Sequence, residues 1–137
     1  MKILFDTNVV LDLLLDRAPF AEEAAQLFAQ VEQGRIIGAL SATTITTIHY
    51  LAIKTLGNAQ ARLHVSHLLQ LFEIAPVTRG VLEEAITLNF SDFEDAVLHE
   101  AGRHSDVQAI VTRDNTGFKK AKLLIYSPAE LLKILTI

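Results

Sequence analysis

A short apolar run near the start of the chain, Ile3-Leu4-Phe5, ends abruptly on Asp6 and is followed by apolar residues at helical spacing. A strand that is apolar at every position is typical of a parallel sheet, in which helices cover both faces. Ligands of such sheets bind at the carboxyl ends of the strands. Asp6 therefore stands where α/β proteins keep their binding residues, although an Asp before a helix is also a common helix cap.

Four further segments repeat this alternation of apolar strand and amphipathic helix. The expected strands cover residues 3–5, 36–40, 72–75, 107–112 and 123–126. Such alternation predicts right-handed crossovers and a parallel sheet with helices on both sides. We therefore predict an α/β fold, a single-domain αβα sandwich with a five-stranded parallel sheet over residues 1–137.

Local signals predict where the helices begin. Asn8 is expected to start the first helix, and Pro19 the second, where its missing amide hydrogen is harmless. Ser-x-x-Glu patterns at 91–94 and 127–130 fit the capping box. The first of these boxes gives Glu94 a structural task and leaves its neighbour Asp95 without one.

Composition excludes several classes of protein. The chain has 137 residues and no cysteine, which rules out disulfides, zinc–thiolate sites and thiol nucleophiles. Sixteen acidic residues against twelve basic ones give a net charge of −4, so no broad basic surface for nucleic acid is predicted. No secretion signal or membrane span is recognised, and we expect a cytoplasmic protein. The mean hydropathy of +0.33 favours an interface with a second copy or a partner.

Acidic positions from distant parts of the sequence are expected at one edge of the sheet. Asp6 and Asp114 follow the first and fourth strands, whose carboxyl ends lie at the same edge because the sheet is parallel. The helix that leads into the fourth strand starts near Asp92 and Asp95, which share a helical face. The helix dipole explains Asp92 equally well. The convergence favours a binding role for Asp6 over a cap alone.

Carboxylates that cluster without cations repel one another, and such a cluster at a binding edge usually holds a metal ion. Oxygen ligands suit Mg²⁺ or Mn²⁺, which activate water and stabilise charge on a phosphate. We therefore expect Mg²⁺ or Mn²⁺ as the cofactor and phosphodiester cleavage as the reaction.

Basic residues near Asp114 agree with a phosphate-containing substrate. Arg113 directly precedes it and is a candidate phosphate contact. Lysines in the next loop are either further phosphate contacts or an ordinary solvated loop: Lys119, Lys120 and Lys122. The five histidines lack a metal-ligand spacing and are assigned no role.

Three segments, LFDTNVVLDLL, FEDAVLHEAG and AIVTRDNTGF, resemble the motifs of the PIN domain, notably of its VapC-like subgroup. The resemblance spans the whole chain, with the motifs in the right order. It implies the αβα sandwich and a metal-dependent ribonuclease of toxin–antitoxin type, with RNA as the substrate. Together with the high hydrophobicity, it also implies a homodimer and an antitoxin protein, with the helices near 20–33 and 42–71 as the dimer face or peptide groove.

The resemblance assigns roles residue by residue. Carried over by position, the family's catalytic and metal-binding acids fall on Asp6, Asp95 and Asp114. Asn8 matches the polar residue after the first acid, and Thr112 matches the small hydroxyl residue before the last Arg-Asp pair. Asp92 and Asp12 also match residues often seen in this subgroup. Asn8, Asp92, Thr112 and Arg113 are thus expected to contact the substrate or to support the metal-binding acids.

The chain departs from the family in the helix after the second strand. The family commonly has an acid about six positions past the Ser that opens this helix, and this chain has Thr47 there. Thr44 and Thr47 share a helical face and can hydrogen-bond a metal-bound water, but a hydroxyl cannot replace the charge of a carboxylate. Two hypotheses follow: a ribonuclease with weakened metal binding, or a PIN-fold protein with a degenerate site that binds RNA or protein without catalysis.

Overall fold

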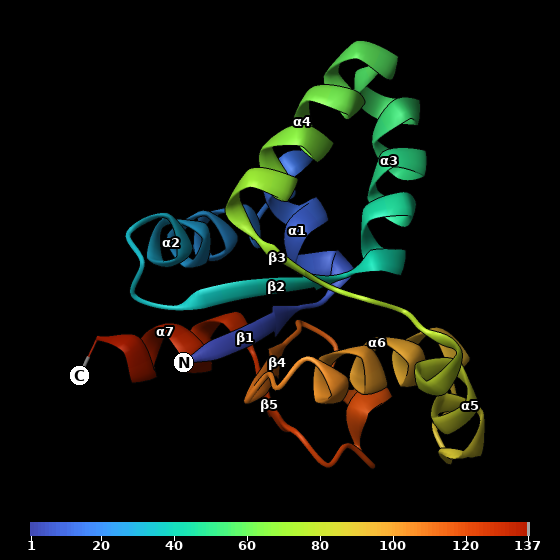
Figure 1. Ribbon diagram of the computed structural model, residues 1–137. Helices are drawn as coiled ribbons and strands as arrows, with labels where there is room; N and C mark the ends of the chain where they lie inside the picture. The colour runs from blue at the N-terminus through green and yellow to red at the C-terminus, as the bar shows by residue number, and fades with distance from the viewer. Residues whose placement is uncertain (137) are drawn as a thin grey trace.

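The computed structural model describes residues 1–136 and contains a five-stranded parallel sheet (Figure 1). The strand order is β3-β2-β1-β4-β5, so β1 lies at the centre between β2 and β4. The strands are β1 Lys2–Phe5, β2 Ile37–Ser41, β3 Glu73–Ala75, β4 Ala109–Val111 and β5 Leu124–Tyr126. All four strand pairs are parallel, which confirms the predicted α/β fold and its five-stranded sheet.

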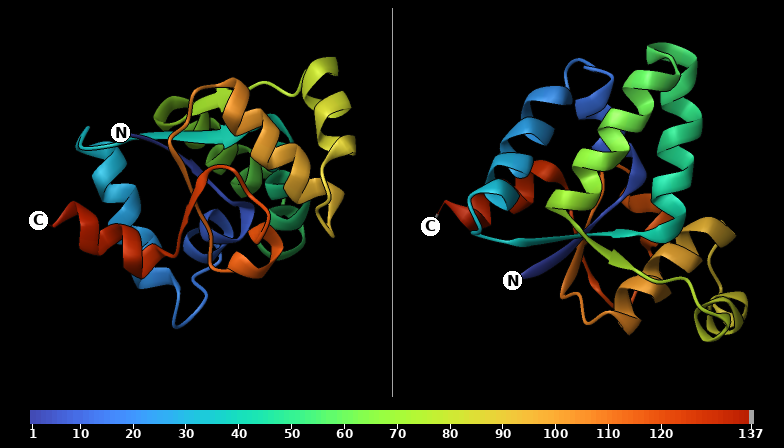
Figure 2. Two further views of the ribbon diagram at one scale, coloured as in Figure 1. Left: turned by 90° about the horizontal axis from the view of Figure 1, so that it is seen from below. Right: turned by 45° about the horizontal axis from the view of Figure 1, so that its top comes forward.

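Helices cover both faces of the sheet. They are α1 Thr7–Leu14, α2 Ala21–Glu32, α3 Ala42–Leu56, α4 Asn58–Leu71, α5 Arg79–Thr87, α6 Phe93–His104 and α7 Pro128–Leu135, with a short 3₁₀ helix η1 at Asn115–Phe118. Helices α1 to α4 lie on one side of the sheet, and α5 and α6 lie on the other (Figure 1). Helix α7 packs beside α2 (Figure 2). No helix within residues 1–136 is long and apolar enough to cross a membrane.

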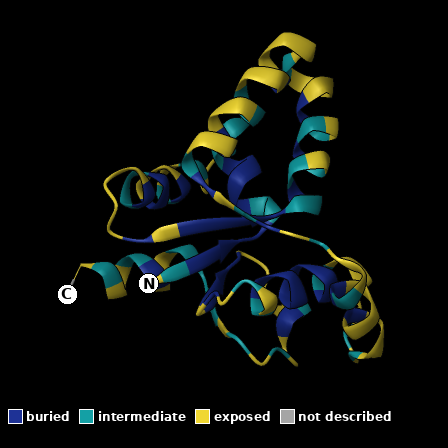
Figure 3. Cartoon of the chain, viewed as in Figure 1, coloured by how far each residue is buried: buried dark blue, intermediate teal, exposed yellow. Residues whose placement is uncertain are grey.

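The two faces of the sheet are packed with side chains of different size. On the α1–α4 side, Phe5 lies 5.8 Å from Phe28 and 5.1 Å from Phe72 between ring centroids, in edge-to-face contacts. On the other side, small buried residues such as Ala96 and Ala101 let α6 approach the sheet closely. Most residues of β1, β2, β4 and α6 are buried, whereas the edge strands β3 and β5 and the outer sides of α4 and α5 are more exposed (Figure 3).

The first two helices begin at residues other than those predicted. Asp6 caps α1 in place of Asn8, because its extended backbone (φ −68°, ψ 152°) sets its carboxylate beside the free amide of Thr7. Helix α2 begins at Ala21, and Pro19 lies before it, after a cis peptide bond, so the prediction that Pro19 opens this helix was wrong.

The capping box predicted at 91–94 does not form, because α6 begins one residue later. Asp92 caps the helix, and its Oδ1 accepts a hydrogen bond from the amide of Glu94 at 2.8 Å. Both Ser and Asp cap helices well, so the local sequence did not distinguish Ser91 from Asp92. The second capping box, at 127–130, forms as predicted and starts α7.

Candidate metal centre

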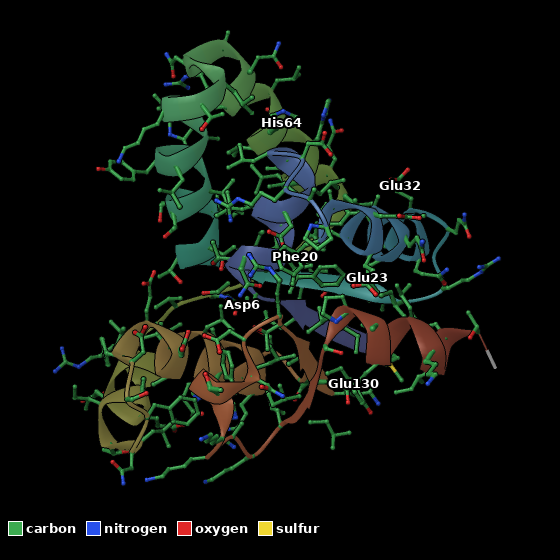
Figure 4. All side chains as sticks on the ribbon, turned by 180° about the vertical axis from the view of Figure 1, so that it is seen from behind. Asp6, Phe20, Glu23, Glu32, His64 and Glu130 are labelled. Carbon is green, nitrogen blue, oxygen red and sulfur yellow. The ribbon has the colours of Figure 1, made fainter. Side chains whose placement is uncertain are left out.

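An open cleft of about 350 Å³ lies where the carboxyl ends of β1 and β4 meet the start of α6. Figure 4 shows Asp6 at this junction, between the two helical layers. Asp6 directly follows β1, Asp114 follows β4, and the other acids belong to the cap and first turn of α6. Five acidic residues line the cleft: Asp6, Asp92, Glu94, Asp95 and Asp114.

Asp6 is held through both of its carboxylate oxygens. Its Oδ1 accepts a hydrogen bond from the Thr7 amide at 2.7 Å. Its Oδ2 accepts one from the Thr112 hydroxyl at 2.7 Å and one from Asn8 Nδ2 at 3.4 Å. Burial raises the pKa of Asp6, and the hydrogen bonds from Thr112 and Thr7 oppose that shift. Asp6 is thus the cap of α1 and also a wall of the cleft.

Thr112 connects the acids that follow the two central strands. Its buried hydroxyl donates to Asp6 and accepts a hydrogen bond from the Asp114 amide at 3.1 Å. Asp114 in turn caps η1, because its Oδ1 accepts from the Thr116 amide at 3.3 Å and from the Thr116 hydroxyl at 2.5 Å. A single buried hydroxyl therefore ties Asp6 to the backbone of Asp114.

Asp95 stands at the centre of the acidic group. Burial raises its pKa to about 7, with further contributions from the negative charges of Asp6, Asp92, Asp114 and Glu94. The backbone of η1 also closes over this carboxylate: a Cβ atom built on Gly117 would lie 2.5 Å from Asp95 Oδ2. Only glycine allows so close an approach at this position.

The side chains of the cleft fit a hard divalent cation. Every acidic ligand offers oxygen, and four threonine hydroxyls from α1 and α3 line the same space. Arg17 is the only basic residue that lines the cleft in the described part of the chain, so the carboxylates are not balanced by neighbouring cations. Burial is the main cause of the raised pKa of Asp95, and a bound Mg²⁺ or Mn²⁺ would offset the repulsion among the acids that adds to it.

Most of the other predicted site residues also line the cleft. Asn8, Asp92, Thr44 and Thr47 all do so. The Thr44 hydroxyl is buried and lies 3.0 Å from Thr7 Oγ1, so it is already paired within the protein. Helix α3 contributes hydroxyl groups to the cleft and no carboxylate.

Arg113 does not line the cleft, and the structure gives it a different partner from the predicted phosphate. Its Nε and Nη2 donate to buried Asp12 at 2.6 and 3.0 Å, and its guanidinium lies 4.0 Å from the ring centroid of Phe20. Asp12 is 101 positions away in the sequence, so no local pattern indicates this pair. Arg17 lies 3.7 Å from the same carboxylate and does line the cleft.

The sequence alone did not indicate two charged residues of the cleft, Arg17 and Glu94, as members of the site. Glu94 was assigned to a capping box that does not form, although its place beside Asp95 in the first turn of α6 was a usable signal. Arg17 lies in the connection between α1 and α2, where no motif marks it. Both residues contribute to the charge of the cleft, so they are added to the candidate site residues.

A second group of ligand-type side chains lies near the other end of α6. The ligand atoms of Glu84, Glu100 and His104 lie within 4.8 Å of one another. Arg103 Nη2 donates to Glu84 at 3.2 Å and to Glu100 at 3.0 Å, and His99 Nδ1 lies 2.7 Å from Glu100. Both carboxylates already form ion pairs with Arg103, which argues against a metal ion.

Known proteins resemble this chain in sequence and in structure. Residues 2–116 match the PIN domain family. Ribonuclease VapC1 of Aquifex aeolicus is 23% identical over 120 residues, covering 84% of this chain and 83% of that protein. A toxin–antitoxin complex from Klebsiella pneumoniae has a similar fold, with a TM-score of 0.71 at 22% identity over 92% of this chain and 97% of that one. The sarcin-ricin loop cleaving toxin VapC20 of Mycobacterium tuberculosis aligns with a TM-score of 0.69 at 16% identity over 86% of this chain and 94% of that one.

The match to the family covers most of the chain, and the segments around Asp6, Asp95 and Asp114 all lie within it. Those segments implied a parallel sheet with acids at the carboxyl ends of its strands, and the structure has this arrangement. The chain belongs to the PIN domain family.

Proposed function

We propose that this protein is a divalent-metal-dependent ribonuclease of a toxin–antitoxin system, acting on RNA in the cytoplasm. The observation that carries the proposal is the cleft in which five carboxylates, from the ends of two strands and the start of one helix, meet with a single lining cation. The sequence similarity to ribonuclease VapC1 and the fold similarity to VapC20 support RNA as the substrate.

The residues of the cleft would have three roles: metal binding, orientation of a metal ligand and phosphate binding. Asp6, Asp95 and Asp114 would hold Mg²⁺ or Mn²⁺, which when bound supplies an activated water and stabilises charge on the phosphate. Thr112 fixes the orientation of Asp6 through its 2.7 Å hydrogen bond. Arg17 lines the same cleft and would pair with a phosphate oxygen.

The assay combines purified protein, labelled single-stranded RNA and Mn²⁺. The wild-type protein is expected to cleave the RNA, and Asp95→Asn is expected to cleave it on the order of 100-fold more slowly, because the cleft loses a metal ligand. Glu83→Gln is the matched control: it removes an exposed acid of α5 that, within residues 1–136, pairs with Arg79 alone, at 3.6 Å, and it should keep full activity. Equal cleavage by Asp95→Asn and the wild type would refute the assignment.

A non-catalytic binding module is the second candidate, and one observation favours it: α3 brings Thr43, Thr44 and Thr47 to the cleft and no acid. The variant Thr47→Glu separates the two candidates. If the site is weakened but active, the added carboxylate tightens Mn²⁺ binding and raises the cleavage rate. A protein that binds RNA, binds no Mn²⁺ at millimolar concentration and gains nothing from Thr47→Glu would be the binding module.

An apolar groove of about 360 Å³ between α1, α2 and α4 is the site proposed for an antitoxin peptide. Leu13, Leu14, Phe28, Leu68 and Leu71 supply its apolar lining, and Figure 4 labels two polar lining residues, Glu32 and His64. The toxin–antitoxin complex from Klebsiella pneumoniae, which has a similar fold, supports such a partner.

Co-purification with a co-expressed candidate antitoxin tests the groove. Leu14→Glu is expected to abolish co-purification, because it puts a charge into the apolar lining. Leu82→Glu, at an exposed leucine of α5, should not affect it. Retention of the partner by Leu14→Glu would refute the groove as its binding site.

A homodimer is proposed through the α3–α4 hairpin, which projects from the sheet (Figure 1). Large apolar side chains are exposed on these two helices: Tyr50, Ile53, Leu63 and Leu69. Light scattering should give the mass of a dimer for the wild type and of a monomer for Leu69→Asp. A wild-type monomer at working concentration would refute the dimer.

A further inference from the structure

A second pocket, of about 250 Å³, adjoins the acidic cleft and is called the side pocket below. One wall is Asn89–Ser91, the segment that leads into α6, and the other is formed by residues of and just after η1, up to Lys120. Asp92 directly follows the first wall, and Thr116 in the second wall donates to Asp114. Each wall of the side pocket therefore continues into an acid of the cleft.

The side pocket combines an aromatic ring, neutral polar groups and cations. Phe90 is half-buried, and Asn89 and Ser91 beside it offer an amide and a hydroxyl. Lys119 and Lys120 are exposed on the opposite wall, and neither takes part in an ion pair within residues 1–136. Proteins that bind single-stranded nucleic acid use this combination, with the base on an aromatic face and the phosphate beside a cation.

Buried contacts hold both walls in place. The Phe90 ring lies 5.3 Å from the ring of His99 and 6.1 Å from that of Phe118, between centroids. His99 Nε2 accepts hydrogen bonds from the backbone amides of Lys122 and Leu123 at 3.1 and 3.3 Å. A fully buried histidine of α6 thus anchors the segment before α6 and the segment after η1 together. A ligand would meet a preorganised pocket and lose little binding free energy to ordering it.

The charge of the acidic cleft adds a second reason for a neighbouring cationic pocket. The cleft carries five carboxylates and one lining cation in the described part of the chain, and the protein has a net charge of −4. Five carboxylates outweigh one arginine and one bound divalent ion, so further positive charge close to the cleft would favour the approach of a polyanion. The lysines of the side pocket supply positive charge, and Gly117, which lines the same pocket, lies against the Asp95 carboxylate.

We propose that the side pocket binds one nucleotide of the RNA, the one next to the cleaved bond. Its base stacks on Phe90, its base edge meets Asn89 and Ser91, and its phosphate pairs with Lys119 and Lys120. This inference rests on the proposed ribonuclease function and deepens it, because it assigns the residues that select which bond is cut.

A double-mutant cycle between protein and RNA tests the base contact. Mn²⁺-dependent cleavage first maps the cut bond, and binding is then measured in EDTA with single-stranded RNAs that lack one base on either side of it. For the wild-type protein, one abasic position is expected to weaken binding about 10-fold. In Phe90→Leu, which keeps the apolar contacts of the ring with the core, the same abasic position should cause little further loss.

Phe93→Leu is the matched control, because Phe93 is exposed at the start of α6 and lines neither the cleft nor the side pocket. It should show the full abasic effect. Urea denaturation of both variants verifies that they remain folded. An abasic effect of equal size in Phe90→Leu and the wild type would overturn the base contact, even if cleavage of RNA stands. A wild-type protein that cleaves RNA with Mn²⁺ but shows no effect of any abasic position would overturn the side pocket alone, and one that neither cleaves nor binds RNA would overturn the proposed function as well.

Salt dependence tests the phosphate contact separately. Replacing Lys119 and Lys120 by Ala should reduce the slope of log Kd against log salt by about 0.7, as expected for one neutralised phosphate of a single strand. Lys133→Ala, which removes an exposed lysine of α7, should leave the slope unchanged. An unchanged slope in the double variant would overturn the phosphate contact.

Discussion

The two ends of helix α6 carry acids in opposite electrostatic situations. At its start, Asp95 lies among four other carboxylates, and burial with their repulsion raises its pKa to about 7. Near its end, burial alone would raise the pKa of Glu100, but hydrogen bonds from Arg103 and His99 outweigh it and hold that pKa well below its usual range. The acids at the start of the helix carry negative charge that neighbouring cations do not balance. The acids near its end form ion pairs with Arg103.

This difference shows that proximity of ligand atoms does not by itself make a metal site. Glu84, Glu100 and His104 place ligand atoms within 4.8 Å of one another, yet Arg103 donates to both carboxylates. A cation that entered there would have to displace the guanidinium. At the start of α6 a metal ion would instead relieve repulsion, so charge balance favours that end.

The largest expected effect separates metal binding at the two ends. Asp95→Asn should weaken Mn²⁺ binding in titration calorimetry on the order of 100-fold, because it removes a proposed ligand. Glu100→Gln should bind Mn²⁺ as the wild type does. Loss of Mn²⁺ binding in Glu100→Gln alone would reverse the assignment of the two ends.

In contrast to Mn²⁺ binding, the free energy of unfolding should depend on the acids near the end of α6. Glu100→Gln is expected to lower the free energy of unfolding in urea by about 2 kcal/mol, because Arg103 and His99 lose a charged, buried partner. Glu83→Gln breaks only an exposed pair with Arg79 and should change it by less than about 0.5 kcal/mol. Equal effects of the two variants would show that the pairing at the end of α6 is not a stabilising feature.

Arg17 tests whether the cation at the acidic end serves the substrate. Arg17→Gln should lower kcat/KM for RNA about 10-fold, the loss expected for one charged hydrogen bond. Its effect on stability should be small, since its contact with Asp12 is long, at 3.7 Å, and Arg113 keeps that carboxylate paired. Unchanged cleavage by Arg17→Gln would leave Arg17 without a part in phosphate binding.

A smaller effect concerns pH in the absence of added metal. The pKa of Asp95 rises from 3.8 to about 7 on folding, so the wild type loses stability as pH increases through that window. Asp95→Asn lacks this titration, and its Tm should exceed that of the wild type by about 3 °C at pH 8 and by less at pH 5. Other groups titrate in both proteins and largely cancel in the difference. A Tm difference that is constant from pH 5 to pH 8 would contradict the raised pKa.

The two ends of α6 also differ in how much of their structure was predictable from the sequence. That Asp6 and Asp114 each follow a strand of one parallel sheet, and that Asp95 lies in the first turn of a helix, was readable because each feature is local. The exact start of α6 was not readable, since Ser91 and Asp92 are equally good caps and one residue decides the role of Glu94. The fully paired end of α6 gave no signal, because Arg103 reaches Glu84 on another helix.

By itself, the sequence determined the alternation of strands and helices, the parallel sheet and the edge at which its acids gather. Periodicity and strand ends suffice for this, because they depend on neighbours in the chain. Tertiary structure alone decided which polar groups are paired: Arg113 with Asp12 across 101 positions, and His99 with the backbone amides of Lys122 and Leu123. Such pairings depend on how closely the packed helices and strands approach one another. A local sequence pattern does not indicate which residues from distant segments come into contact.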